Sequence, residues 1–132
     1  MTNFQKLSET EAELMQTIWA CGRPVTSGEL LQIFETQKGK VWKGQTIATF
    51  LARLVEKGLL SVVGQQGRTN IYAPCMSPEE YRRREAKSLL ETLYEGSVKN
   101  FLSALYDGEK LTKNEIIELK RWFEEKAGEK NG

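Results

Sequence analysis

The sequence lacks histidine altogether, and its only two cysteines, Cys21 and Cys75, are far apart. Histidine is the most common general base and metal ligand, so its absence argues against both kinds of site. The cysteines form no C-x-x-C pair, and we expect them to be reduced, buried thiols. No nucleotide-binding or nucleophile motif is present. The sequence therefore predicts a protein that is not an enzyme and has no catalytic residue, metal site or cofactor.

Long apolar runs and a strong charge of either sign are also missing. Residues 1–6 lack the apolar segment of a secretion signal, and no run approaches membrane-spanning length. We therefore expect a soluble, cytoplasmic protein without membrane insertion. The net charge is only +1, whereas nucleic-acid binders are often strongly basic. One stretch, residues 38–57, is nevertheless basic with a single acid, Glu56. Its basic residues are Lys38, Lys40, Lys43, Arg53 and Lys57.

What the sequence does contain is a set of clear helix starts. In the pattern S/T-x-x-E, the hydroxyl and the carboxylate each accept a hydrogen bond from a free backbone N–H at the helix N-terminus. The pattern occurs at Ser8–Glu11, Thr26–Glu29, Ser77–Glu80 and Thr112–Glu115. Together with apolar spacing it predicts helices over about residues 8–21, 26–38 and 44–57 in the first part of the chain.

The pattern then changes period. Residues 59–63 and 69–73 are rich in β-formers and flank a glycine-bounded loop, residues 64–68, which predicts a β-hairpin. Further helices are predicted at about 78–94, 98–106 and 113–126. These three short helices carry more apolar surface than they can bury on one another, which favours a homodimer. The candidate interface residues are Leu89, Leu93, Phe101 and Leu105.

Three helices followed by a hairpin is the order of a winged helix-turn-helix, in which the third helix reads DNA. The predicted fold is therefore mainly α with a small β-hairpin. Residues 1–75 would form the DNA-binding domain, 76–127 a helical dimerisation domain, and 128–132 a frayed end. On the third helix, Gln45, Thr49 and Arg53 are suited to base edges in the major groove. Candidates for the DNA backbone are Lys43, Thr46 and Arg68.

These residue types also occur on ordinary solvated helices. A winged helix can likewise act as a protein–protein adaptor without DNA, and the near-neutral charge keeps that alternative open. The Arg82-Arg83-Arg84 run is interpreted as a solvated helix face, and Trp19, Trp42 and Trp122 as packing residues.

Four segments resemble the penicillinase repressor family (BlaI/MecI type). They are L-S-E-T-E-A-E-L-M-Q-T-I-W (7–19), V-W-K-G-Q-T-I-A-T-F-L-A-R-L-V-E-K-G (41–58), E-A-K-S-L-L-E-T-L-Y-E-G-S (85–97) and L-T-K-N-E-I-I-E-L (111–119). The resemblance implies a winged-helix repressor that binds a palindromic double-stranded DNA operator as a homodimer through its tail. It further implies release when a membrane-bound sensor protease system, triggered by a β-lactam, leads to cleavage within the tail.

The sequence departs from the family pattern at two places. Lys43, Gln45 and Ala48 stand where relatives often have a serine cap and basic residues, which leaves the base preference open. The family's cut is at an Asn-Phe bond, and a gap-free match puts the equivalent bond at Ala104–Leu105. An Asn-Phe pair does occur, at Asn100–Phe101, about one helical turn earlier. Either the match slips by a turn, or the bond has changed, or this chain is never cleaved and answers to another signal. A separate interpretation is that Asn100–Phe101 is a chance dipeptide on a core-facing helix.

Overall fold

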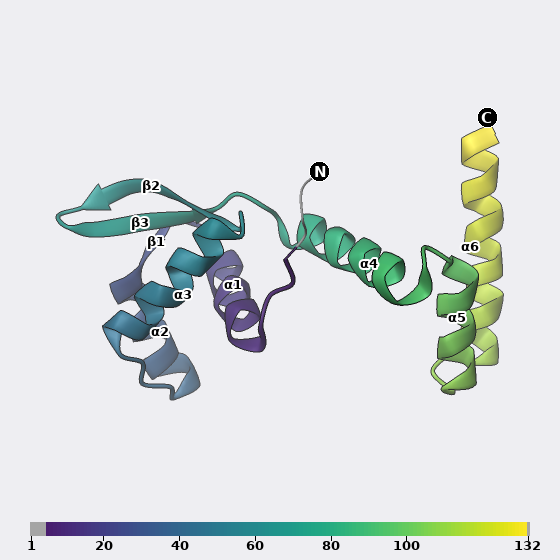
Figure 1. Ribbon diagram of the computed structural model, residues 1–132, viewed down its shortest axis with the longest axis horizontal. Helices are drawn as coiled ribbons and strands as arrows, with labels where there is room; N and C mark the ends of the chain where they lie inside the picture. The colour runs from purple at the N-terminus through teal and green to yellow at the C-terminus, as the bar shows by residue number, and fades with distance from the viewer. Residues whose placement is uncertain (1–4, 132) are drawn as a thin grey trace. The chain divides into compact units, whose positions relative to one another are not determined.

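The computed structural model describes residues 5–131, and the side chains of residues 5–129. The elements in chain order are α1 (Glu9–Cys21), β1 (Val25–Thr26), α2 (Ser27–Lys38), α3 (Gly44–Glu56), β2 (Leu60–Gln66), β3 (Thr69–Pro74), α4 (Pro78–Tyr94), α5 (Val98–Asp107) and α6 (Lys113–Asn131) (Figure 1). The chain divides into two compact units, Met1–Glu85 and Ala86–Gly132. Across the described residues, no helix has both the length and the apolar character needed to span a membrane.

The predicted helix starts are confirmed. The Ser8, Thr26 and Thr112 hydroxyls each accept a hydrogen bond from the backbone N–H three residues on, and the glutamate there accepts one from the capping residue. At the start of α4 only half of this exchange forms. The Ser77 hydroxyl accepts a hydrogen bond from the Glu80 N–H. The Glu80 carboxylate, however, pairs with Arg84 rather than with the Ser77 N–H, with 3.0 Å between nitrogen and oxygen.

The predicted hairpin forms and is joined by a third strand that the sequence analysis did not predict. The sheet is antiparallel in the order β1-β3-β2. Strand β1 is two residues long, and its Val25 lies opposite Tyr72 of β3. The register shifts between Val62 and Gly64, which is a β-bulge, and pairing then continues to Gln66 opposite Thr69. The hairpin loop is therefore only Gly67 and Arg68, shorter than predicted.

The hydrophobic core lies within the first unit. Helix α1 contributes Leu14, Met15 and Ile18, and α2 contributes Leu30 and Phe34, all fully buried. Tyr81 at the start of α4 is buried as well, and its hydroxyl accepts a hydrogen bond from the Leu7 N–H at 3.0 Å. The expectation that both cysteines are buried was wrong: Cys21, the last residue of α1, is half-buried, and Cys75, just after β3, is exposed.

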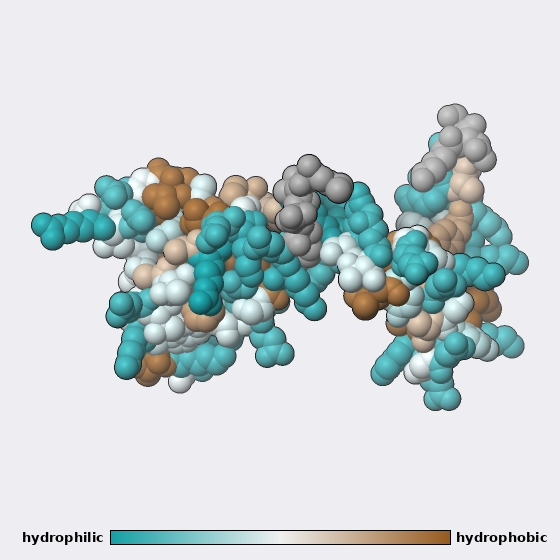
Figure 2. Space-filling view, viewed as in Figure 1, coloured by the Kyte–Doolittle hydropathy of each residue, from teal (hydrophilic) through white to brown (hydrophobic). Residues whose placement is uncertain are grey.

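The second unit has no such core. From Ala86 to residue 129 no side chain is buried, and large apolar residues of α4, α5 and α6 stay exposed. Figure 2 shows hydrophobic residues at the surface of this unit. Trp122, interpreted as a packing residue, is half exposed, whereas Trp19 and Trp42 do pack against the core of the first unit. Helix α6 continues beyond the predicted end at residue 126, as far as Asn131.

Candidate nucleic-acid interface

Helix α3 has one buried face and one exposed face. Ile47, Leu51 and Leu54 are fully buried and fix the helix to the first unit. On the opposite side, Gln45, Thr49 and Arg53 are exposed and follow one another at four-residue spacing, so they lie along one face. The Thr49 hydroxyl donates to the Gln45 carbonyl oxygen at 3.0 Å, which orients its methyl group and oxygen. The structure therefore brings together the three residues predicted to read bases.

Two of the residues predicted to contact the DNA backbone lie at the N-terminus of α3. Lys43 is the N-cap residue, its side chain makes no capping hydrogen bond, and both Lys43 and Thr46 are exposed. The first turn contains no acidic residue. The free N–H groups at a helix N-terminus carry partial positive charge and favour a phosphate group. This end of α3 is therefore suited to an anion.

Arg68, the third residue predicted to contact the DNA backbone, does not lie on α3. It is exposed in the two-residue turn that joins β2 to β3, at the tip of the hairpin (Figure 1). Gly67 beside it has a φ of +63°, a left-handed conformation that favours glycine. The side chains of Gln65 and Asn70 hydrogen-bond across the strands behind the turn at 3.2 Å. A well-defined turn thus presents Arg68 to solvent.

The basic stretch seen in the sequence is divided between two roles. Lys38 and Lys40 both pair with Glu13 of α1, at 3.4 and 2.7 Å. Lys57, just after α3, donates to the buried Glu11 carboxylate of α1 at 2.7 Å. By contrast, Lys43, Arg53 and Arg68 form no ion pair with any carboxylate of residues 5–129. The basic stretch therefore offers a partner less positive charge than the sequence suggests: Lys43 and Arg53 within it stay unpaired, and Arg68 adds a third unpaired side chain from the hairpin turn.

The two acids of α1 that pair with lysines, Glu11 and Glu13, both have a lowered pKa. Burial raises the pKa of the Glu11 carboxyl, but hydrogen bonds from Lys57 and Ser8 outweigh it and hold the pKa below its ordinary value. The hydrogen bond from Lys40 likewise lowers the pKa of Glu13. Because both carboxylates are ionised, they neutralise the lysines beside them. Sequence reasoning missed this pairing, which joins residues more than 20 positions apart.

An aromatic cluster supports the exposed face of α3. Trp42 lies between Phe34 and Phe50, with ring centroids 5.4 and 5.6 Å away. Phe34 is fully buried, and Phe50 is half-buried on α3. The Arg53 guanidinium lies over the Phe50 ring, 5.3 Å from its centroid. The sequence analysis did not predict this contact between Phe50 and Arg53.

Comparisons with known proteins agree with this architecture. The protein family described as "Penicillinase repressor" matches residues 7–125. The chain belongs to this family. The penicillinase repressor of Bacillus licheniformis is 28% identical over 130 residues, which cover 98% of each chain. The penicillinase repressor of Staphylococcus aureus is 29% identical over 123 residues, which cover 91% of this chain and 93% of that one. The repressor function predicted from the sequence is thereby confirmed.

A solved structure shows the same fold at lower sequence identity. A complex structure of RosR from H. salinarum is similar with a TM-score of 0.51 and 14% identity, over 80% of this chain and 90% of that one. At this identity the likeness concerns the fold alone. Helices α1 to α3, the three-stranded sheet and its hairpin wing form the winged helix-turn-helix of this repressor.

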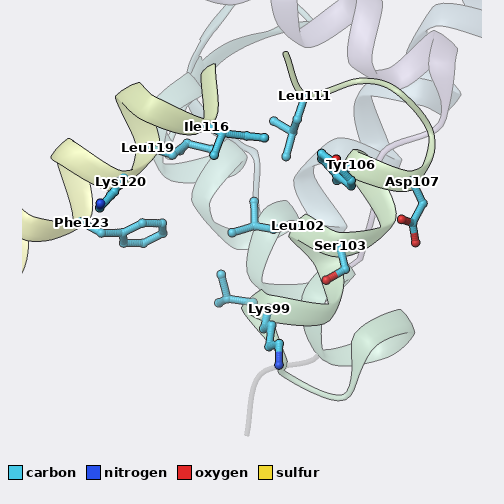
Figure 3. Close-up of a pocket in the computed structure, with 11 residues that line it drawn as sticks. Lys99, Leu102, Ser103, Tyr106, Asp107, Leu111, Ile116, Leu119, Lys120 and Phe123 are labelled. Atoms are coloured by element: carbon cyan, nitrogen blue, oxygen red, sulfur yellow. The ribbon is translucent and has the colours of Figure 1, made fainter. Parts of the chain in front are cut away.

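The four predicted dimerisation residues are only part of the apolar surface on the repressor's second unit. Leu89 and Leu93 of α4 are 41% and 65% exposed, while Phe101 and Leu105 of α5 are half-buried, with Phe101 packed on Tyr94. Residues of α5, of α6 and of the segment that joins them line a groove of about 570 Å³. Figure 3 shows Leu102, Leu111 and Phe123 among the side chains around it. Exposed apolar residues that the prediction omitted are Val98, Tyr106, Ile116, Ile117, Trp122 and Phe123.

Both candidate cleavage bonds lie inside α5. Asn100 and Ala104 are exposed, and the residues that follow them, Phe101 and Leu105, are half-buried. Ser97 caps this helix by accepting a hydrogen bond from the Asn100 N–H at 3.1 Å. Each bond is therefore part of a capped helical segment.

Proposed function

We propose that this repressor binds an operator through α3 and the hairpin wing. Gln45, Thr49 and Arg53 would read base edges in the major groove, because their side chains are exposed on one helix face and can donate or accept hydrogen bonds. Lys43, Thr46 and Arg68 would contact the sugar-phosphate backbone. The observation that carries the proposal is that Lys43, Arg53 and Arg68 form no ion pair with a described carboxylate. By contrast, Lys38, Lys40 and Lys57 are each paired with a glutamate of α1.

The proposed DNA-binding form is a homodimer. We assign DNA binding to residues 1–75 and dimerisation to residues 76–127, where Leu89, Leu93, Phe101 and Leu105 would meet their counterparts. The support is the uncovered apolar surface of the second unit, which a second copy would bury. A symmetric dimer presents two reading helices, so its operator should be a palindrome with half-sites about 10 base pairs apart or a multiple of that.

The DNA interface is tested with a duplex selected from a random library by the full chain. We expect Gln45→Ala or Arg53→Ala to weaken binding by about 1–3 kcal/mol and to relax the preference at one operator position. Lys43→Ala or Arg68→Ala should weaken binding to all sequences and lower the salt slope by about one unit. Arg83→Ala is the matched control, since Arg83 is exposed on α4 and lies outside the proposed face.

Two outcomes would reject the interface. If neither Gln45→Ala nor Arg53→Ala changes affinity or preference, the wrong face has been chosen. If the full chain shows no salt-dependent binding to any duplex, the fold acts as an adaptor and not as a DNA reader. Dimerisation is tested by sedimentation at micromolar concentration. A strictly monomeric full chain, or a fragment of residues 1–75 that dimerises equally well, would reject the assignment of the tail.

Induction would follow from cleavage in the tail. We propose that a membrane-bound sensor protease system responding to a β-lactam leads to a cut at Asn100–Phe101 or Ala104–Leu105, which would link the protein to antibiotic resistance. A cut there separates α6 and part of α5 from the chain, so the proposed interface loses Leu105, and Phe101 as well after the earlier cut, and the dimer is weakened. A monomer reaches the second half-site only from solution, so operator occupancy falls. The proposal places the protein in the cytoplasm, where the operators of its bacterial relatives lie.

The cleavage step is tested by mass spectrometry of the protein from β-lactam-treated cells. Fragments that end at Asn100 or at Ala104 would identify the bond. An intact chain during full derepression would reject cleavage and require another inducing signal.

A further inference from the structure

The side chain of Arg53 is held by an aromatic contact rather than by an acid. Its guanidinium lies 5.3 Å from the centroid of the Phe50 ring, and no carboxylate of residues 5–129 pairs with it. A guanidinium within about 6 Å of an aromatic face is attracted by the negative charge of that face. This attraction restricts the rotation of the side chain. Arg53 is thus partly ordered while its N–H donors stay available.

The ring beneath Arg53 is itself fixed. Phe50 and Trp42 form a T-shaped pair with an interplanar angle of 70°, and Trp42 packs on Phe34, which is fully buried. The position of the Phe50 ring is therefore tied to the hydrophobic core through two further rings. A long arginine side chain loses rotational freedom when it binds a base, and holding it in advance reduces that loss.

We infer that Phe50 is a positioning residue for sequence-specific DNA recognition, acting by holding the Arg53 guanidinium over its ring in the orientation that reads one operator base pair. The inference rests on the proposed function, because it requires Arg53 to read a base. It assigns part of the recognition to a half-buried residue that packs on Trp42 and acts through Arg53. Non-specific binding to phosphates should not depend on this contact.

The test is a double-mutant cycle in the full chain, with the duplex selected by the wild-type protein. Phe50→Leu keeps an apolar side chain but removes the ring. We expect it to weaken operator binding about three- to fivefold and to leave binding to random duplex DNA unchanged. In the Arg53→Ala background, Phe50→Leu should cause no further loss, because the guanidinium is already absent.

Two further variants separate positioning from folding. Replacing Phe50 with pentafluorophenylalanine keeps the shape of the ring but removes the negative charge of its face, and it should reproduce the effect of Phe50→Leu. Phe50→Tyr keeps the charge of the face and should restore wild-type preference. If Phe50→Leu does not fold, the pentafluorophenylalanine variant alone tests whether the charge of the ring face positions Arg53.

The outcomes are distinguishable. If Arg53→Ala reduces operator preference but neither the fluorinated ring nor Phe50→Leu does, the inference is wrong and the proposed interface stands. If Phe50→Leu weakens operator and random DNA equally, or acts fully in the Arg53→Ala background, Phe50 has only a structural role. If Arg53→Ala itself has no effect, the inference fails, and the proposed reading face fails with it if Gln45→Ala has no effect either.

Discussion

The two units of this repressor differ in how far they bury their apolar side chains. In the first unit, residues from all three helices and the sheet converge on one core, and leucines such as Leu14, Leu30 and Leu51 are fully buried. In the second unit, α5 and α6 leave a groove and exposed aromatic rings, and no described side chain is buried. The first unit therefore contains its own stabilising core, whereas the second unit has the surface of an element that needs a partner.

The largest expected effect tests the core of the first unit. Phe34→Ala removes a fully buried ring that also supports Trp42, and it should lower the free energy of unfolding by about 3–5 kcal/mol. Urea unfolding of the full chain would measure the change. Val41→Ala is the control: Val41 is 81% exposed, and its truncation should change stability by less than about 0.5 kcal/mol. Equal losses for the two variants would contradict the assignment of Phe34 to a stabilising core in the first unit.

The next effect tests the surface of the second unit. Leu93→Ala truncates a residue that is 65% exposed and should leave the folded monomer almost unaffected. If Leu93 lies in the interface, the variant should weaken dimerisation by about 1–3 kcal/mol, as truncation of a buried interface residue does. Sedimentation equilibrium measures the dimer dissociation constant. Lys87→Ala, an exposed change on the same helix, should dimerise as the wild type does. An unchanged constant for Leu93→Ala would remove it from the interface.

A smaller effect concerns the charged contact between α1 and the end of α3. Glu11→Gln keeps an acceptor for the Ser8 N–H but removes the charge that pairs with Lys57. The Glu11 side chain is only 3% exposed, so we expect a loss of about 1–2 kcal/mol at pH 7. Glu13→Gln, at a more exposed pair, should cost less. Chemical unfolding at pH 7 compares the two variants.

The same pair predicts a pH dependence. A carboxyl whose pKa is lowered on folding stabilises the protein above its ordinary pKa of 4.5, and this contribution is lost as the pH falls through the lower folded pKa. Wild-type stability should therefore fall below about pH 5, and Glu11→Gln should show a shallower fall over that range. Parallel curves for the two proteins would show that Glu11 does not contribute.

The smallest expected effect concerns a helix cap in the second unit. Ser97→Ala removes the acceptor for the Asn100 N–H and should destabilise the start of α5 by about 1 kcal/mol. Hydrogen exchange of the α5 amides should become about fivefold faster. Ser103→Ala, within the same helix, should not accelerate exchange because alanine is the better helix former. Acceleration in both variants would point to a general loss of structure.

Local signals in the sequence predicted all six described helices and the exposed face of α3. The Ser8 and Thr26 caps could be recognised because the partner glutamate stands three residues away. The alternation of Ile47, Leu51 and Leu54 with polar residues likewise predicts which side of α3 is buried. These features depend on neighbours along the chain, which the sequence shows directly.

Contacts between distant segments could not be predicted in the same way. Strand β1 has two residues and exists only because Val25 pairs with Tyr72, so no local period reveals it. The pairing of Lys57 with Glu11 joins residues 46 positions apart, and it removes a positive charge that the sequence assigned to the basic stretch. The contact of Arg53 with Phe50 is local, but the fixed position of the ring depends on Trp42 and Phe34.

The helical state of α5 gives the proposed induction a time course of its own. Asn100–Phe101 and Ala104–Leu105 are both enclosed by helical hydrogen bonding, so a protease can act only on chains in which α5 has opened. When opening and closing are fast, the rate of such a cut follows the equilibrium population of the open form. A dimer that covers α5 lowers this population, so free monomers would be consumed first. The delay between protease activation and derepression is then set by the stability of this ten-residue helix as much as by the protease.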